Sequence, residues 1–261
     1  MNIVVCIKQV PDTNEVRIDP VKGTLIRDGV PSIMNPDDKA ALEFALEIKD
    51  KTPDAHVAVV SMGPPQAEEI LREGLAMGAD DAYLITDRAF GGADTWATSS
   101  TIAAAITKLD YDLIVCGRQA IDGDTAQVGP EMAEHLGIPN VSYAASVDVE
   151  GDSVVVKRQY DDGYHMVRAK MPCLVTALAE AVKPRYMTPG AIFDACENYE
   201  ITRWGRPDVP VDDANIGLAG SPTRVAKSFP KPVKAPGMKI EKGVDESVQF
   251  IMDRLHDKYV L

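Results

Sequence analysis

Short apolar runs alternate with helix-like patterns through the first half of this 261-residue chain. The segments 3–7, 56–60, 82–85 and 113–116 are mainly apolar and too short for helices, which is typical of strands buried in a sheet. Between them, apolar residues recur at helical spacing. Because parallel strands need long crossover connections, this alternation predicts an α/β fold with a doubly wound, mostly parallel sheet.

The sequence also predicts where one helix begins. Asn35 suits the N-cap position and Pro36 the first turn, and Asp37 and Asp38 would face the positive end of the helix dipole. A ligand role for Asn35 and Pro36 is the less favoured interpretation of this pattern. Gly137 is a plausible C-terminal stop for a later, short helix.

The period changes after about residue 147. The segments Val147-Asp148-Val149 and 154–156 flank a turn, which predicts an added antiparallel hairpin, and we expect another pair of strands over 166–167 and 174–177. Prolines accumulate beyond residue 183. We therefore expect a nucleotide-binding α/β domain over 1–199, and a C-terminal arm over 200–261 that ends in an amphipathic helix and packs on a partner subunit.

Charge and hydropathy exclude several classes of partner. The chain has 27 basic and 40 acidic residues and a formal charge of −13, which disfavours binding to nucleic acids and anionic membranes. No apolar run is long enough to span a bilayer, so we expect no membrane insertion. Because Met1 leads directly into a strand pattern without a cleavage site, we expect no signal peptide and a cytoplasmic location. The Lys-rich stretch 227–239 is either a solvated tail or a docking segment.

The cysteines and histidines form no metal-ligand or nucleophile pattern. Cys6 and Cys116 lie in apolar runs, where thiols usually act as small hydrophobic groups. The chain also lacks the GxGxxG and GxxxxGK[ST] phosphate loops. These observations predict no metal site and no catalytic side-chain machinery.

Ligands of open parallel sheets bind beyond the carboxyl ends of the strands, where the strand order reverses. The loops expected at that edge are 8–12, 32–38, 61–65, 91–98 and 117–129. In the last loop, Gly123 permits a positive φ or close ligand approach, and Arg118 offers a forked cation. Thr125, Gln127 and the amides around Val128 are placed to cap the next helix or to hold a pyrophosphate. A helix-capping loop without a ligand is an equally weighted alternative.

Several ordered segments resemble the β subunits of electron-transfer flavoproteins over essentially the whole chain. They are VCIKQVPD at 5–12, DGVPSIMNPDD at 28–38, SMGP at 61–64, LAMGAD at 75–80, GRQAIDGDTAQVGP at 117–130, VKRQYDDG at 156–163, KMP at 170–172 and PRY at 184–186. The resemblance implies a heterodimer with an α subunit. In this family the β subunit carries AMP in ordinary members and FAD in electron-bifurcating members.

The resemblance, together with the loops above, assigns the cofactor contacts. These are Cys6, Asn35, Met62, Gly63, Asp94, Thr95, Thr98, Gly117, Arg118, Gln119, Ala120, Ile121, Asp122, Gly123, Asp124, Thr125, Ala126, Gln127 and Val128. Gly123 between two aspartates, with Ala126 before the glutamine, is similar to the bifurcating branch, where a small residue leaves room for the larger cofactor. Arg118 is expected to influence the flavin electrostatically.

This branch implies that FAD accepts hydride from NADH. It then passes electrons to ferredoxin or flavodoxin and, through the FAD of the α subunit, to an acyl-CoA dehydrogenase for butyryl-CoA or caffeyl-CoA. The resemblance places partner recognition on Arg185, Tyr186, Met187, Thr188 and Pro189.

Three alternatives remain at this point. One is an ordinary β subunit with structural AMP, and a second is a universal-stress-type ATP-binding module. The third is an ATP pyrophosphatase, since residues 90–95 weakly resemble the SGGxDS loop of those enzymes.

Overall fold

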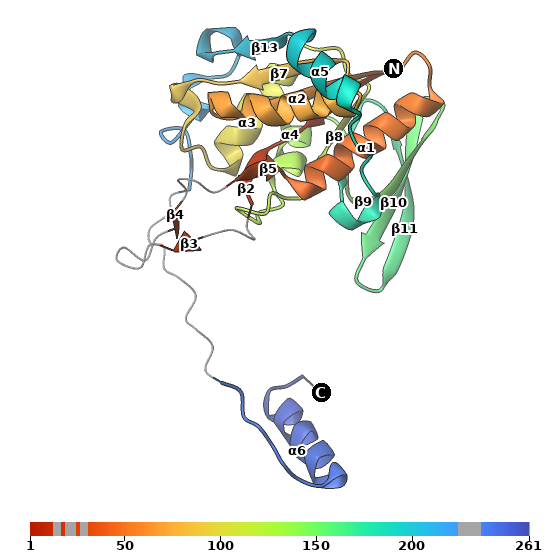
Figure 1. Cartoon of the computed structure of the whole chain (residues 1–261), viewed down its shortest axis with the longest axis vertical. Helices are drawn as coiled ribbons and strands as arrows, with labels where there is room; N and C mark the ends of the chain where they lie inside the picture. Colours follow the sequence, from red (N-terminus) through yellow and green to blue (C-terminus); the bar gives the residue numbers. More distant parts are fainter. Residues whose placement is uncertain (13–16, 19–24, 27–30, 224–235, 261) are drawn as a thin grey trace. The chain divides into compact units, whose positions relative to one another are not determined.

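The computed structural model describes residues 1–12, 17–18, 25–26, 31–223 and 236–260. The chain divides into two compact units, Met1–Ala226 and Lys227–Leu261. The first contains the sheet and its helices, and the second contains one helix (Figure 1). Residues 28–30 of the DGVPSIMNPDD segment, and residues 227–235 of the Lys-rich stretch, lie outside the described residues.

A nine-stranded sheet forms the centre of the first unit, in the order β11-β10-β9-β12-β8-β1-β6-β7-β13. The strands are β1 (Asn2–Cys6), β6 (His56–Met62), β7 (Asp81–Ile85), β8 (Leu113–Gly117), β9 (Asn140–Glu150), β10 (Ser153–Tyr160), β11 (Gly163–Lys170), β12 (Cys173–Ala177) and β13 (Ile201–Trp204). In this spatial order, β11 pairs with β10 and β10 with β9 in antiparallel fashion. Every other neighbouring pair, from β9–β12 through to β7–β13, is parallel. The expected α/β class with an added hairpin is confirmed.

Two small antiparallel pairs precede the first helix. They consist of β2 (Gln9–Pro11) with β5 (Ser32–Met34), and β3 (Arg17–Ile18) with β4 (Leu25–Ile26).

The strand order reverses at β1. From β1 the chain proceeds outward through β6 and β7, and then crosses to β8 and β12 on the other side. The boundary between β1 and β8 is therefore the topological switch point, where open α/β sheets place their ligands. Cys6 and Cys116 are paired in register at the carboxyl end of this boundary.

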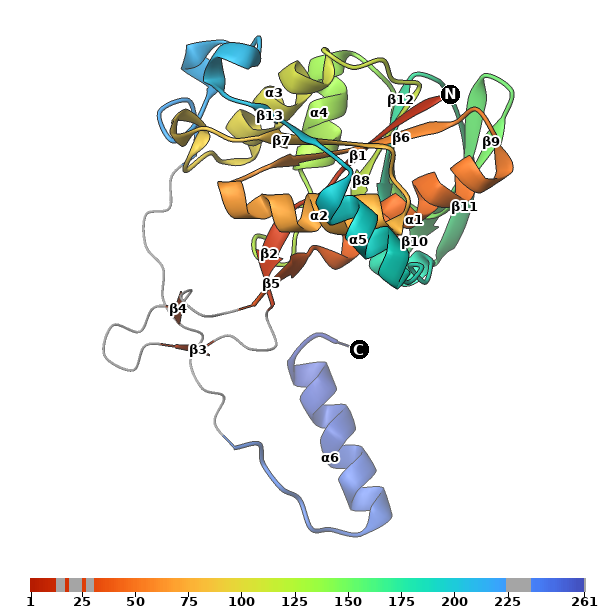
Figure 2. The same cartoon turned by 45° about the horizontal axis from the view of Figure 1, so that its top comes forward.

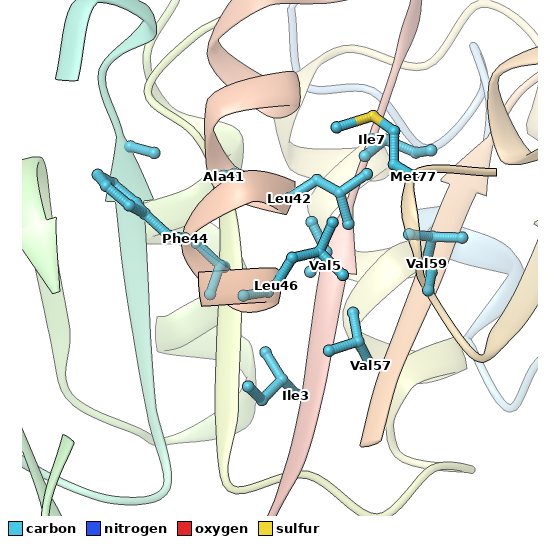
Figure 3. Close-up of a cluster of buried hydrophobic side chains, with 14 of the residues drawn as sticks. Ile3, Val5, Ile7, Ala41, Leu42, Phe44, Leu46, Val57, Val59 and Met77 are labelled. Atoms are coloured by element: carbon cyan, nitrogen blue, oxygen red, sulfur yellow. The ribbon is translucent and has the colours of Figure 1, made fainter. Parts of the chain in front are cut away.

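Two helix layers cover the sheet on opposite faces (Figure 2). The helices of this unit are α1 (Pro36–Lys51), α2 (Glu68–Met77), α3 (Thr95–Ile106), α4 (Val128–Leu136) and α5 (Pro189–Glu197). Because side chains alternate along a strand, Ile3 and Val5 of β1 pack with Leu42 of α1 (Figure 3). Val4 packs on the other face with Ile106 of α3.

Both strands expected over 166–167 and 174–177 are present, but they do not pair with each other. The first segment belongs to β11, which pairs with β10, while β12 lies between β8 and β9 as a parallel strand. Every residue of Cys173–Ala177 is buried. A run that is buried on both faces is characteristic of a central parallel strand and not of a hairpin edge.

The sheet also continues past the domain boundary expected at residue 199. Strand β13 pairs with β7 in parallel, and Ile201 and Trp204 are buried. The Trp204 ring stacks on Tyr83 at 4.7 Å between centroids. The first unit consequently runs beyond the expected start of the arm, because an aromatic contact and a strand ladder hold residues 201–204 to the sheet edge.

The second unit contains α6 (Val244–Asp257), close to the amphipathic helix expected over 245–259. Val244, Val248, Ile251 and Met252 are exposed and recur at helical spacing, so they form an apolar stripe on this helix. Among the described residues, no helix is long and apolar enough to cross a membrane.

Gly117 ends β8 where the start of α1 comes closest. A Cβ added there would overlap Asp38 Oδ1 and would lie 2.7 Å from Asp37 Cβ. We predict that Gly117→Ala lowers the free energy of unfolding by about 1–3 kcal/mol, because buried backbone and carboxylate must move apart. Urea unfolding of the purified protein measures this change.

Gly123→Ala is the matched control in the same loop. A Cβ at Gly123 meets no atom within 4 Å, and its φ is not positive. The expected change is within about 0.5 kcal/mol. If Gly117→Ala and Gly123→Ala lower the free energy of unfolding equally, the close contact of Gly117 with the start of α1 does not explain the loss.

Candidate functional site

Buried polar side chains at the start of α1 organise the carboxyl edge of the sheet. Asp38 is 7% exposed, and its two oxygens accept hydrogen bonds from backbone N–H groups on different strand ends. Lys8 N donates to Oδ2 at 2.8 Å, and Gly117 N donates to Oδ1 at 2.8 Å. One carboxyl group therefore joins the segment after β1 to the end of β8.

Asp37 makes a second connection of the same kind. It is 4% exposed and accepts hydrogen bonds from Ala179 N at 2.9 Å and Gln119 N at 3.3 Å. Arg118 Nε lies 3.3 Å from its Oδ2 atom. The start of α1 thus holds the chain beyond β1, β8 and β12 together.

Burial sets the protonation of these acids. Burial raises the pKa of Asp38 to about 7, although the hydrogen bonds from Lys8 N and Gly117 N lower it. Burial also raises the pKa of Asp37, while the guanidinium of Arg118 acts in the opposite direction. These carboxyl groups are structural anchors, and burial favours their protonated form.

Asn35 occupies the expected N-cap position but makes a different contact. Its side chain makes no capping hydrogen bond to α1. Instead, Nδ2 donates to Gln119 O at 2.8 Å, and Oδ1 accepts from Ile121 N at 3.1 Å. The fully buried amide therefore fixes the loop that follows β8.

The loop 117–129 turns at two of its predicted contact residues, in a backbone conformation that the sequence did not predict. Asp124 and Ala126 have φ values of 51° and 53°, while the positive φ expected at Gly123 is not observed. Non-glycine residues in the left-handed region store strain of about 1 kcal/mol or more, which occurs preferentially at ligand sites. Such turns direct successive N–H groups toward one side, as in anion-binding nests.

Further contacts hold this loop in place. Lys8 Nζ donates to both Asp122 oxygens at 2.7 and 2.9 Å. Gln119 Nε2 donates to Asp124 Oδ1 at 3.0 Å. Ala120 O accepts from Gly123 N and Asp124 N. Thr125 and Val128 complete the loop, and Val128 begins α4, which has no side-chain cap.

Arg118 and Tyr143 lie together beside the switch point. The Arg118 Cζ atom is 5.8 Å from the centroid of the Tyr143 ring. Tyr143 has a φ of 61° inside β9, and its N–H donates to Thr176 Oγ1 at 3.1 Å. A sequence pattern gives no sign of this strained tyrosine, because nothing in its neighbours requires a left-handed residue within a strand.

Cys6 and Cys116 are neutral thiols in the floor of this region. Both are buried. Burial raises the pKa of Cys6 to about 12, and burial raises that of Cys116 as well. We call the part of the sheet edge formed by Cys6, Asn35 and the loop 117–129 the switch-point crevice, because open α/β sheets bind their ligands at this position.

The other predicted contacts lie around the N-terminus of α3. Asp94 caps this helix by accepting from Ala97 N at 3.1 Å, and it also accepts from Thr223 N and Oγ1 at 2.9 and 2.8 Å. Both of its oxygens are therefore bonded within the protein. Thr95 Oγ1 lies 3.2 Å from Gln127 Oε1, which connects the starts of α3 and α4.

A cleft of about 710 Å³ opens at the carboxyl ends of β6 and β7. We call it the β6–β7 cleft. It is lined by Met62, Gly63, Pro64, Pro65, Ile85, Thr86, Asp87, Arg88, Phe90, Gly91, Gly92, Ala93 and Thr98. The predicted contacts are therefore divided: Met62, Gly63 and Thr98 line this cleft, whereas Cys6, Asn35 and the loop 117–129 form the switch-point crevice.

The residues expected to recognise a partner follow α1 and begin α5. Arg185 is anchored, since its N–H donates to Glu43 Oε2 at 2.8 Å and its Nη2 donates to Asp50 Oδ2 at 2.8 Å. Thr188 caps α5, Pro189 begins it, and Met187 packs against the core. Tyr186 is 85% exposed and thus presents the main free aromatic surface of this segment.

In the part of the chain that the structure describes, no three His, Cys, Asp or Glu side chains group as a metal site.

The raised pKa of Asp38 predicts a pH-dependent stability. The folded chain keeps this proton to about pH 7, whereas an unfolded aspartic acid loses it near about pH 4. The contribution of the protonated group to stability is therefore lost as the pH rises through this window. We expect wild type to lose unfolding free energy relative to Asp38→Asn between about pH 4 and pH 7.

Urea unfolding at several pH values measures this difference. The exposed Asp162→Asn variant is the control and is expected to follow the wild-type profile. If the difference in unfolding free energy between wild type and Asp38→Asn does not change between about pH 4 and pH 7, then Asp38 is ionised in the folded chain over this whole range.

Comparison with known proteins identifies the family. The model of the electron transfer flavoprotein domain matches residues 22–203. The chain is 59% identical to an electron transfer flavoprotein subunit beta of Clostridium acetobutylicum and 52% identical to the caffeyl-CoA reductase-Etf complex subunit CarD of Acetobacterium woodii. It is 48% identical to an acryloyl-CoA reductase electron transfer subunit gamma of Anaerotignum propionicum. Each alignment covers 100% of both chains. The chain therefore belongs to the electron transfer flavoprotein family, as a β-subunit member.

Proposed function

We propose that this β subunit holds FAD in the switch-point crevice and accepts hydride from NADH. It would pass electrons to ferredoxin or flavodoxin and, through the FAD of an α subunit, to an acyl-CoA dehydrogenase. The observation that carries the proposal is the loop 117–129, which combines left-handed turns, a guanidinium and an uncapped helix start at the switch point. Four free cysteines agree with action in the cytoplasm.

The chemistry of the crevice fits the diphosphate of a nucleotide cofactor. α4 begins without a side-chain cap, so its first N–H groups are free to receive phosphate. The side chain of Arg118 is oriented by Asp37, and its two terminal nitrogens have no protein partner among the described residues. These donors would bind an anion without rearrangement of the loop.

Room beside the crevice favours a cofactor larger than AMP. Ala126 ends in a methyl group, and Gly123 has open space around it. The β6–β7 cleft adds a volume of about 710 Å³ along the same edge of the sheet. FAD, when bound, supplies two-electron hydride acceptance and one-electron release. The protein would bind and orient it, and Arg118 would stabilise negative charge on its reduced form.

The partners follow from the relatives and from exposed apolar surfaces. Relatives of full length are named as subunits of caffeyl-CoA and acryloyl-CoA reductases, which supports a dehydrogenase acting on an acyl-CoA. The apolar stripe of α6 is suited to packing on an α subunit. Tyr186 would contact the dehydrogenase, while Arg185, Met187, Thr188 and Pro189 hold its segment in place.

The bound nucleotide separates this proposal from structural AMP. We predict that acid treatment of the protein co-purified with its α subunit releases two FAD per heterodimer and no AMP. Chromatography of the released nucleotides measures the ratio. One FAD and one AMP per heterodimer would make the chain an ordinary electron carrier and would overturn the argument from Gly123 and Ala126.

Arg118 should raise the reduction potential of the flavin in this subunit. Removal of its positive charge disfavours the more negative reduced form, so Arg118→Ala should lower the two-electron potential by about 30 mV or more. Spectroelectrochemical titration of the heterodimer measures the shift. Arg168→Ala on β11 is the control, since its guanidinium pairs with Glu150 on the antiparallel hairpin. Equal potentials in wild type and Arg118→Ala would exclude the proposed role.

A further inference from the structure

A chain of hydrogen bonds runs through the contact between α3 and α4. At its inner end, Thr95 Oγ1 lies 3.2 Å from Glu131 Oε1. The other carboxylate oxygen, Oε2, lies 3.2 Å from Ser99 Oγ, and this hydroxyl oxygen lies 3.1 Å from His135 Nε2. Ser100 Oγ is a second neighbour of the same nitrogen, at 3.2 Å. Each step of the chain joins groups that can exchange a proton, because hydroxyl, carboxyl and imidazole groups can both donate and accept one.

This chain connects the site with solvent. Thr95 begins α3 and contacts Gln127 of the loop 117–129, and Thr98, one turn further along, lines the β6–β7 cleft. The Thr95 hydroxyl therefore lies at the junction of the crevice and the cleft. At the other end, His135 is half-buried beneath the exposed Trp96, whose ring packs edge-on against it at 4.7 Å between centroids. Ser99, in the middle of the chain, is fully buried.

The elements around this chain bring few other titratable groups to it. α4 packs against α3, β12 and β9, and neither α3 nor β12 contains a charged residue. The acids of β9, Asp148 and Glu150, are paired with basic side chains elsewhere. Glu134, the other acid of α4, is exposed. Among the described residues of this interface, a proton on Glu131 therefore has His135 as its next titratable acceptor.

The proposed reaction leaves a proton in the site. A hydride from NADH brings two electrons and one proton. One-electron carriers remove the electrons singly and leave the proton behind. For each hydride, one proton must therefore pass from the crevice to water. Positioned side chains that accept and release protons accelerate such transfers by about a hundredfold or more.

We propose that Glu131, Ser99 and His135 form the exit path for this proton, which enters through the Thr95 hydroxyl. The inference rests on the proposed function, because the hydride supplies the proton. Thr95 Oγ1 receives the proton as its own hydroxyl proton passes to Glu131. The carboxyl group then gives a proton to Ser99 Oγ while the Ser99 proton passes to His135 Nε2, and the imidazolium releases a proton to water. Every O–H bond that breaks is replaced, so both hydroxyl groups, the carboxylate and the neutral imidazole are restored.

His135→Ala tests the exit path in the complete heterodimer. The protein is reduced with NADH and then oxidised by ferricyanide, which takes up electrons without protons, while a pH indicator follows proton release in weak buffer. We expect proton release to slow about tenfold or more, and added imidazole to restore it. The FAD content, the equilibrium potential of the flavin and its rate of reduction by NADH should keep their wild-type values, because the path acts only on departing protons. His56→Ala, at the start of β6, is the matched control.

Glu131→Gln checks the path at an earlier step. Proton release should slow here as well, and imidazole should not restore it, because the proton no longer reaches Ser99.

The remaining outcomes separate the exit path from the proposed function. Proton release at the wild-type rate in His135→Ala would refute the path, and slow release that imidazole does not restore would leave His135 a structural role alone. Failure of NADH to reduce the wild-type flavin would refute the proposed function. Proton release from protein reduced with dithionite would then still test the path by the same comparison of variants.

Discussion

The arrangement of the site depends on two buried carboxyl groups at the start of one helix. Asp37 and Asp38 accept backbone hydrogen bonds from Lys8, Gly117, Gln119 and Ala179, which follow or end three neighbouring strands. Each buried N–H left without an acceptor would cost about 1–3 kcal/mol. The carboxyl groups therefore fix the spacing of the strand ends, and with it the position of the loop 117–129. Gly117 is required because any side chain there would occupy the place of these oxygens.

The site has two parts, the switch-point crevice and the β6–β7 cleft, and each contains one arginine. In the crevice, Arg118 pairs with Asp37 through Nε, and its other nitrogens have no partner among the described residues. In the cleft, Arg88 has no counter-ion among the described residues. The two cysteines beneath the crevice are held as neutral thiols by burial, so they add no competing negative charge. Arg118 and Arg88 thus place two positive charges at the carboxyl edge of the sheet in an acidic protein.

The sequence predicted the sheet class and the edge that carries the site, because period and turn residues are local signals. It did not predict that Cys173–Ala177 enters the sheet centre, since a short apolar run fits a hairpin or a buried strand equally well. Trp204 and its strand were assigned to the arm because prolines accumulate beyond residue 183, whereas a strand ladder with β7 holds them to the sheet. Asp37 and Asp38 were expected only to favour a helix dipole, because their burial depends on segments about 80 and 140 residues away. The left-handed turns at Asp124, Ala126 and Tyr143 had no local signal at all.

We propose that an FAD cofactor binds against the loop 117–129. A crystal structure of the heterodimer purified with its native cofactors tests this placement most directly. We expect electron density for FAD in this subunit, with its diphosphate beside Arg118 and the start of α4. Density for AMP alone, or a nucleotide bound away from the ends of β1 and β8, would contradict it.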